Sequence, residues 1–314
     1  MMQISPETQL FIREHSSDDV RVLALQAKKY PDIDMPTVIT QIAGRKVAAE
    51  KIPSWWEIEK IWYPKHLSLE QCSSEITARY KARLLQGDSL TDLTGGFGID
   101  CSFLATGFKS ATYVERQQEL CEIAAHNFPI LNLNHINVKN EDGVSYLQAM
   151  SPVDCIFLDP ARRNEHGGKT VAISDCEPDV AELEELLLNK AGQVMVKLSP
   201  MLDLSLALKE LQHVQEVHII SANNECKELL LILGQASVEE ISIHCVNLPT
   251  KGIQEEQHFV FTREQEQCSE CNYTNVLENY LYEPNASLLK AGAFRSIASA
   301  FPVKKLHPNS HLYT

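Results

Sequence analysis

The most informative segment of the 314-residue chain is a glycine-rich turn headed by an acidic residue, Asp92-Leu93-Thr94-Gly95-Gly96-Phe97-Gly98-Ile99-Asp100. It directly follows a predicted strand, and such a turn before a helix lets a ligand approach the backbone closely. The dinucleotide-binding fingerprint requires G-x-G-x-x-G, but Cys101 stands at the third glycine position. Because the turn opens with the Asp92 carboxylate, it favours a ligand whose near end is cationic or neutral over a pyrophosphate.

Acidic residues also follow or end the next three predicted strands. Glu115 ends the second strand, where a carboxylate can accept hydrogen bonds from both hydroxyl groups of a ribose. Asp142, with its neighbour Glu141, follows the third strand; it could contact an adenine edge, or it could be an acid at a helix N-terminus. Asp159 follows the fourth strand. Four such signals at successive strand ends predict one ligand site.

The elements that would position these residues form a repeating strand–helix pattern from about residue 89, which predicts a parallel sheet covered by helices. Helical patterns separate most of the strands, for example over 117–128 and 179–190. Only about seven residues, 222–228, join the last two strands, so we expect the last one to be antiparallel. The seven predicted strands are 89–92, 111–115, 136–138, 153–158, 193–198, 216–221 and 229–233.

The rest of the chain differs in texture from this α/β core. Residues before about 88 read as short, proline-interrupted amphipathic helices, and the aromatic cluster at Trp55 could stack nucleobases or form part of a helical lid. After Gly234 we expect a small α+β unit with its own strands and a helix over 286–300. The predicted parts are an N-terminal helical region (1–69), the α/β domain (70–235) and the small α+β domain (236–314).

Composition limits the classes of function. The chain has 28 basic and 42 acidic residues, a net charge of −14, which argues against coating nucleic acid through bulk charge. Residues 285–314 nevertheless contain basic residues and no acid, which is either chance or a local binding surface. No apolar run is long enough to span a membrane, and the first residues lack the pattern of a secretion signal. Nine cysteines do not read as a disulfide framework, so we expect a cytoplasmic protein with reduced thiols.

Taken together, the motifs resemble those of class I S-adenosylmethionine-dependent methyltransferases over about residues 70–235. The resemblance implies a Rossmann-like seven-stranded sheet and S-adenosyl-L-methionine as cofactor. The turn residues are similar to the family's first motif, although Thr94 stands where many members have the first glycine. Glu115 resembles the ribose-binding acid, Asp142 the adenine-side acid, and the run from Asp159 the fourth motif. The implied cofactor-binding residues are Ser74, Glu75, Thr77, Asp92, Thr94, Gly95, Gly96, Gly98, Glu115, Asp142 and Asp159.

More narrowly, the turn, the run Leu158-Asp159-Pro160-Ala161-Arg162-Arg163 and Lys197-Leu198-Ser199-Pro200 look like a bacterial group of THUMP-like-domain-containing methyltransferases. That resemblance implies a ferredoxin-like piece near 275–314 and then a THUMP-like domain, of which we expect this chain to contain little or none. It also implies that the helix starting near Ser74 encloses the methionine end of the cofactor, although Ser73 or Ser74 could simply cap that helix.

The sequence limits the class of methyl acceptor but does not identify the acceptor. Ala161 and Arg162 replace the proline and aromatic residue of many base-nitrogen methyltransferases, and no cysteine nucleophile follows the fifth strand, which excludes covalent uridine C5 transfer. We expect an RNA base or other nucleic-acid acceptor in tRNA or rRNA, with Asp159, Arg162 and Lys197 as the catalytic residues and Arg163 as a further contact. One alternative is a ribose 2′-hydroxyl acceptor served by Lys81, Asp159, Lys197 and Glu228.

Two further alternatives remain from the sequence. A catalytically silent module that binds cofactor or RNA is disfavoured by the intact acidic motifs, and a nicotinamide dehydrogenase is disfavoured by the missing third glycine. A single C-x-x-C pair, Cys268 and Cys271, predicts surface thiols rather than a zinc site, for which His244 and His258 could be extra ligands.

Overall fold

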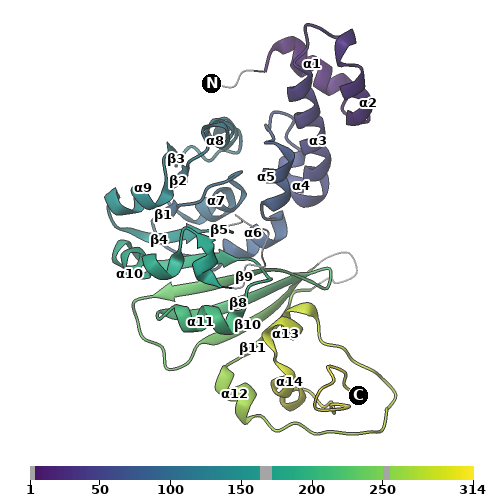
Figure 1. The fold of residues 1–314 in the computed structure, drawn as a ribbon, viewed down its shortest axis with the longest axis vertical. Coiled ribbons are helices and arrows are strands. Elements are labelled where there is room, and N and C mark those ends of the chain that lie inside the picture. The colour runs from purple at the N-terminus through teal and green to yellow at the C-terminus, as the bar shows by residue number, and fades with distance from the viewer. Residues whose placement is uncertain (1–3, 163–171, 250–254) are drawn as a thin grey trace. The chain divides into compact units, whose positions relative to one another are not determined.

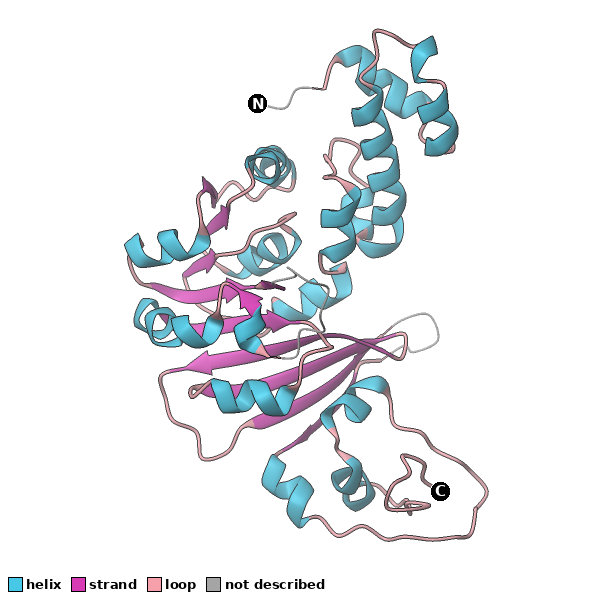
Figure 2. Cartoon of the chain, in the orientation of Figure 1, coloured by secondary structure: helices cyan, strands magenta, loops and turns pink. Residues whose placement is uncertain are grey.

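The computed structural model describes residues 4–162, 172–249 and 255–314. The chain forms two compact units, 1–155 and 156–314, and the division falls inside strand β4 (Val153–Leu158). Each unit contains part of a mixed α/β sheet (Figures 1 and 2).

The first unit begins with helices that are short, as predicted, except for one of 17 residues over Met35–Lys51. Side chains of Ser5, Asp19, Asp34 and Ser74 cap four of them by accepting a backbone N–H of the first turn. Prolines occupy the first turns of α1, α3 and α4, where no N–H is needed. The helices are α1 (Pro6–Glu14), α2 (Val20–Leu25), η1 (Ala27–Lys29), α3 (Met35–Lys51), α4 (Pro53–Trp56), α5 (His66–Gln71) and α6 (Glu75–Lys81).

The sheet of the first unit has the order β4-β1-β2-β3. Its strands β1 (Ser89–Asp92), β2 (Ser110–Glu115) and β3 (Ile136–Asn140) pair in parallel, as predicted. Because parallel strands end at the same edge, the chain segments after β1, β2 and β3 emerge together. The connecting helices are α7 (Ile99–Leu104), η2 (Ala105–Gly107), α8 (Gln118–Ile130) and α9 (Gly143–Ala149).

The second unit continues from β4 with the order β4-β7-β9-β8-β10-β11. The predicted antiparallel strand is confirmed: β9 (Glu225–Gly234) is antiparallel to both β7 (Ala191–Leu198) and β8 (Val214–Ala222). The β8–β9 connection is tighter than expected, because Asn223 and Asn224 both adopt positive φ, +54° and +56°. Such a pair makes a two-residue hairpin turn, which asparagine tolerates.

The remaining elements that precede β10 in this unit are two-residue strands and helices. The short strands β5 (Ala161–Arg162) and β6 (Cys176–Glu177) pair with each other. The helices are η3 (Ile173–Asp175), α10 (Val180–Lys190) and α11 (Leu204–Glu210).

The C-terminal elements differ from the sequence prediction in two ways. Strands β10 (Ser242–Leu248) and β11 (Gln257–Phe261) do not form a sheet of their own; β10 pairs in parallel with β8, and β11 pairs with β10 (Figure 2). The predicted helix over 286–300 is two helices, α13 (Ala286–Ala291) and α14 (Phe294–Ala300), because Gly292 adopts φ +74° and ends the first. Helix α12 (Arg263–Cys268) precedes them. The residue boundaries of the three predicted parts stay a prediction.

Among the described helices, none combines the length and apolar character that crossing a bilayer requires.

Candidate active site

The glycine-rich turn links β1 to α7 and is held in place by its own acidic residue. The Asp92 side chain is only 1% exposed, and its Oδ1 accepts a hydrogen bond from the Thr94 backbone N–H at 3.0 Å. The chain then passes through Gly96 at φ +54° and Gly98 at φ +87°. Side chains rarely adopt this left-handed region, so glycine at both positions follows from the backbone path.

Neighbouring atoms crowd the turn at Gly95 but leave space at Gly96. A Cβ on Gly95 would lie 2.2 Å from the Tyr113 ring, so the chain packs against β2 there. A Cβ on Gly96 would meet nothing nearer than the Thr94 carbonyl oxygen at 3.7 Å. The backbone at Gly96 can therefore be approached closely, as the sequence predicts for a ligand-binding turn.

Glu115 connects the ends of β1 and β2. Its Oε2 accepts a hydrogen bond from the Gly96 N–H at 2.9 Å, and its Oε1 accepts one from the Gln117 N–H at 2.8 Å. The residue is 8% exposed. An ionised carboxylate offers about four acceptor positions, so these two bonds leave capacity for hydroxyl donors.

Asp142 caps a helix. Its Oδ1 accepts hydrogen bonds from the backbone and the hydroxyl of Ser145, at 2.9 and 3.1 Å, at the start of α9. The residue is exposed to solvent. The capping alternative is thus observed, while contact with an adenine stays a prediction.

Helix α6 begins as the capping alternative predicts, at Ser74, whose hydroxyl accepts a hydrogen bond from the Thr77 N–H at 3.5 Å. The carboxylate of Glu75 accepts hydrogen bonds from the Ser54 N–H at 2.8 Å and from the Arg79 guanidinium at 2.7 and 2.9 Å. Burial raises the pKa of Glu75, but these hydrogen bonds outweigh burial and leave the pKa below its ordinary value. Glu75 thus ties α6 to α4; its contact with a cofactor stays a prediction.

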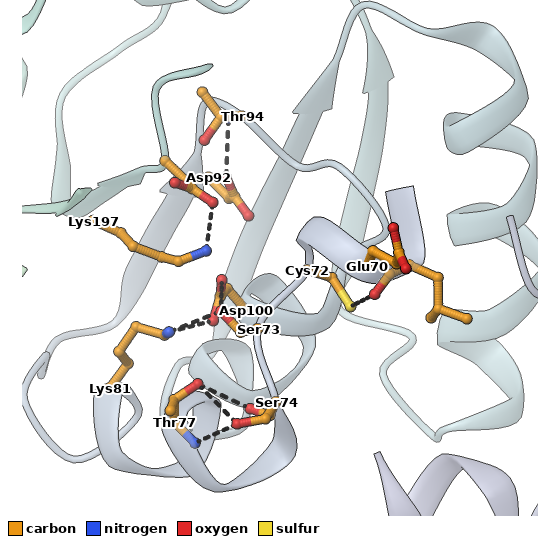
Figure 3. Close-up of polar contacts among 12 residues, drawn as sticks. Glu70, Cys72, Ser73, Ser74, Thr77, Lys81, Asp92, Thr94, Asp100 and Lys197 are labelled. Atoms are coloured by element: carbon orange, nitrogen blue, oxygen red, sulfur yellow. Dashed lines mark hydrogen bonds and ion pairs between the residues drawn. The ribbon is translucent and has the colours of Figure 1, made fainter. Parts of the chain in front are cut away.

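A buried polar group that sequence reasoning missed joins α6 to the glycine turn (Figure 3). The Lys81 Nζ lies 3.0 Å from Asp100 Oδ1 and 2.9 Å from the Ser73 hydroxyl, which donates a hydrogen bond to Asp100 Oδ2 at 2.7 Å. The Lys81 side chain is 0% exposed. Since Asp100 lies in the first turn of α7, this group fixes the helix that follows the turn. The nearest sequence signal is Asp100 itself, two residues after the last glycine of the motif.

Within the aromatic cluster, Trp55 packs into the core, whereas Trp56 is 41% exposed. The Trp55 ring is buried, and its centroid lies 5.2 Å from that of Phe97 in an edge-to-face arrangement. Phe97 belongs to the glycine turn, so the N-terminal helices share a hydrophobic core with it. This is the helical-lid interpretation.

In the second unit, Asp159 directly follows β4 and pairs with Lys197 of β7. The Lys197 Nζ lies 2.5 Å from Asp159 Oδ2, and the lysine is largely buried whereas the aspartate is partly exposed. Arg162 lies in β5, where its backbone pairs with Cys176. Arg163 lies outside the described residues. Glu228 is buried in β9.

The basic residues of 285–314 are used within the fold. Lys290 donates a hydrogen bond to the Leu202 carbonyl and Arg295 donates one to the Gln267 carbonyl. Lys304 forms an ion pair with Glu278 at 2.8 Å, and Lys305 is buried. These contacts favour a structural role for the stretch over a dedicated binding surface. The thiols of Cys268 and Cys271, at and after the end of α12, are free.

Comparison with solved structures gives a strong similarity. A protein of Porphyromonas gingivalis W83, described as a "putative methyltransferase", is 36% identical to this chain with a TM-score of 0.87. The match covers 100% of this chain and 79% of that protein. A family model described as a ferredoxin-like domain matches residues 280–314, which confirms the expected C-terminal ferredoxin-like piece.

Two further similarities are weak. A Streptococcus mutans protein described as a putative methyltransferase in complex with SAH is 15% identical, with a TM-score of 0.37, over 51% of this chain and 96% of that one. An rRNA methylase from Streptococcus thermophilus is 15% identical, with a TM-score of 0.36, over 51% of this chain and 95% of that one. Values this low carry no information about substrate. No curated protein matches the chain.

Proposed function

The chain belongs to the same family as the Porphyromonas gingivalis W83 protein, and we propose that it is an S-adenosylmethionine-dependent methyltransferase acting on nucleic acid. The observation that carries the proposal is the glycine turn whose Gly96 N–H is bound by Glu115. This arrangement aligns an approachable backbone with a carboxylate at the ends of two adjacent parallel strands.

The residues at the turn fit this cofactor. A ligand with a cationic methionine end suits a site that contains the buried acids Asp92 and Glu115, and Gly96 leaves room for close approach. Glu115 would bind the ribose hydroxyls and Asp142 the adenine edge. Ser74, Glu75 and Thr77 would enclose the methionine end. Bound S-adenosylmethionine would supply a methyl group on a sulfonium, which needs no metal or covalent enzyme intermediate.

The contribution of the protein to methyl transfer is chiefly positioning, because the acceptor must lie in line with the transferred methyl group. We propose that Asp159 accepts a hydrogen bond from the acceptor group. The ion pair with Lys197 supports this role, since it holds the Asp159 carboxylate in one place. Arg162 would contact an anionic part of the substrate.

We propose RNA as the acceptor and a THUMP-like-domain-containing methyltransferase as the narrower grouping. The ferredoxin-like domain at 280–314 supports the grouping. The net charge of −14 argues for recognition by a local surface instead of a wholly basic one.

A ribose 2′-hydroxyl acceptor is the second candidate, and the Lys197–Asp159 pair favours it. A lysine flanked by acids is a suitable type of group to deprotonate a hydroxyl. Against it, Lys81 is held in the buried group with Asp100 and Ser73, so that lysine already has a structural role.

Transfer of tritium from labelled S-adenosylmethionine to separate pools of undermodified RNA, protein and small molecules tests the proposal. The variants are Asp159→Ala and Asp159→Asn, the second of which retains a hydrogen-bond acceptor for Lys197. The exposed Glu185→Ala on α10 is the control. We expect nuclease-sensitive label that Asp159→Ala lowers by about 100-fold or more through lost positioning, with cofactor affinity largely kept.

Other results would each contradict a different part of the proposal. Label confined to protein or small molecules would remove RNA as acceptor. Equal turnover in Asp159→Ala would refute the role of Asp159. No label in any pool, together with tight cofactor binding, would favour the silent binding module. Nucleoside analysis of labelled RNA separates base methylation from 2′-O-methylation.

A further inference from the structure

Strands β8 and β10 bring together metal-ligating side chains that have no role in the proposed active site. His218 and His244 are register partners across the parallel β8–β10 pair. Glu216 precedes His218 by two residues on β8, and residues two apart on a strand face the same side of the sheet. These three residues, the His–Glu cluster, therefore lie on one face of the sheet.

The ligand atoms of the cluster converge. Glu216 Oε2 lies 3.0 Å from His218 Nε2 and 4.0 Å from His244 Nε2. One ligand atom from each residue can be chosen so that all lie within 4.8 Å of one another. The two imidazoles are stacked, with centroids 4.3 Å apart and planes inclined by 20°. Both Nε2 atoms thus lie within 4.0 Å of the same Glu216 oxygen.

These separations are close to those of a zinc site. Bonds of about 2.0–2.1 Å in tetrahedral geometry place neighbouring ligand atoms about 3.3 Å apart. The two separations from Glu216 Oε2, 3.0 and 4.0 Å, bracket that value, and one ligand atom from each residue lies within 4.8 Å of the others. Two histidines and one carboxylate are also a donor set that zinc uses when one position is left for water.

A fourth residue orients one of the ligands. His244 Nδ1 lies 3.1 Å from Nε2 of His258 on β11, so one of these nitrogens must donate a proton to the other. If His244 Nδ1 is the donor, the lone pair of His244 is on Nε2, the atom that faces Glu216. Histidine ligands of metals commonly have their second nitrogen fixed by such a hydrogen bond.

The cluster is open to solvent. The Glu216 side chain is 46% exposed, which gives an ion access to the ligand atoms.

We propose that Glu216, His218 and His244 bind one divalent transition-metal ion, with zinc as the best fit, and that His258 orients His244. The ion would connect β8 to β10, the strand that extends the sheet of the second unit. This site is independent of the methyl-transfer proposal, because none of its residues belongs to that machinery.

The test is zinc binding by the metal-stripped full chain in competition with a chromophoric chelator, with cobalt(II) absorption reporting coordination geometry. We expect one ion per chain with a four-coordinate cobalt spectrum. His244→Ala and Glu216→Gln should each weaken zinc binding by at least about 100-fold, and His258→Gln by roughly 10-fold, as for a residue that orients a ligand. Glu216→Gln is isosteric at a half-exposed position, so it keeps the test valid if His244→Ala fails to fold.

Two control variants test whether the ion binds at the His–Glu cluster or elsewhere on the chain. The exposed His66→Ala on α5 should bind like the parent. A double Cys268→Ser, Cys271→Ser variant should also bind like the parent, with no thiolate–cobalt charge-transfer band in the parent. Absence of binding, equal affinity of the parent and Glu216→Gln, or loss of binding only in the cysteine double variant would each overturn the proposal.

Discussion

The sharpest prediction concerns Glu115→Gln, because its effects on folding and on binding can be separated. The amide keeps one oxygen and turns the other into an NH₂ group. The two carboxylate oxygens now accept from the Gly96 and Gln117 N–H groups at 2.9 and 2.8 Å. Whichever way the amide turns, one backbone N–H must face another donor.

The two effects are similar in size but are measured separately. A buried donor left without its partner costs about 2 kcal/mol, and this loss should appear in the free energy of unfolding. One lost hydrogen bond from a ribose hydroxyl to a charged acceptor weakens the free energy of cofactor binding by about 2 kcal/mol, which is roughly a 30-fold rise in the cofactor Kd. Urea denaturation measures the first, and calorimetric titration with S-adenosylhomocysteine measures the second.

The control is Glu119→Gln, which changes a half-exposed carboxylate on α8 that pairs with Lys65. It should leave both quantities nearly unchanged, since exposed ion pairs contribute little. A Glu115→Gln variant that loses stability but keeps its Kd within about threefold of the parent would refute the ribose-binding role. A variant that loses neither would refute the anchoring of the turn by Glu115 as well.

Two further predictions concern the first unit. Lys81→Met should lower the free energy of unfolding by about 3–5 kcal/mol, because it leaves the buried Asp100 carboxylate uncompensated; the added change Asp100→Leu should restore part of the loss in urea denaturation, and additive losses would contradict the pairing. Glu75 has a lowered pKa in the folded state, so its stabilisation is present above its ordinary value of 4.5 and is lost as the pH falls through the lower folded-state value. Glu75→Gln should therefore unfold more easily than the parent near neutral pH, and the gap should close in acid; a gap independent of pH would show that the carboxylate charge is not the cause.

Local signals in the sequence predicted the parallel core well. The strand before the glycine turn, 89–92, and the strand before Asp159, 153–158, have the expected limits, because buried parallel strands are short apolar runs bounded by turn residues. The contact between Glu115 and the turn could also have been predicted, since adjacent parallel strands end at the same edge of a sheet. The break at Gly292 carried a signal that was missed: a lone glycine within a helical pattern is a common C-terminal cap.

Non-local pairings were not predictable in the same way. The alternation around Ile243 indicated a strand, but which strand it pairs with depends on the geometry of the whole sheet, and the pairing of β10 with β8 has no local mark. The Lys81–Asp100 pair was not predictable either, because a lysine near the end of a short helix is normally solvated and no neighbouring residue indicates that it is buried. The convergence of Glu216, His218 and His244 follows from the same unforeseen pairing.

The addition of β10 and β11 has a consequence for how the protein behaves at high concentration. Without them β8, nine residues long and mostly buried, would end the sheet with a row of unpaired N–H and C=O groups. Long apolar edges of this kind recruit strands from other molecules and cause aggregation. With them, the sheet instead ends at β11, which is five residues long and carries mostly exposed side chains. The C-terminal part of this chain thus protects its sheet from self-association.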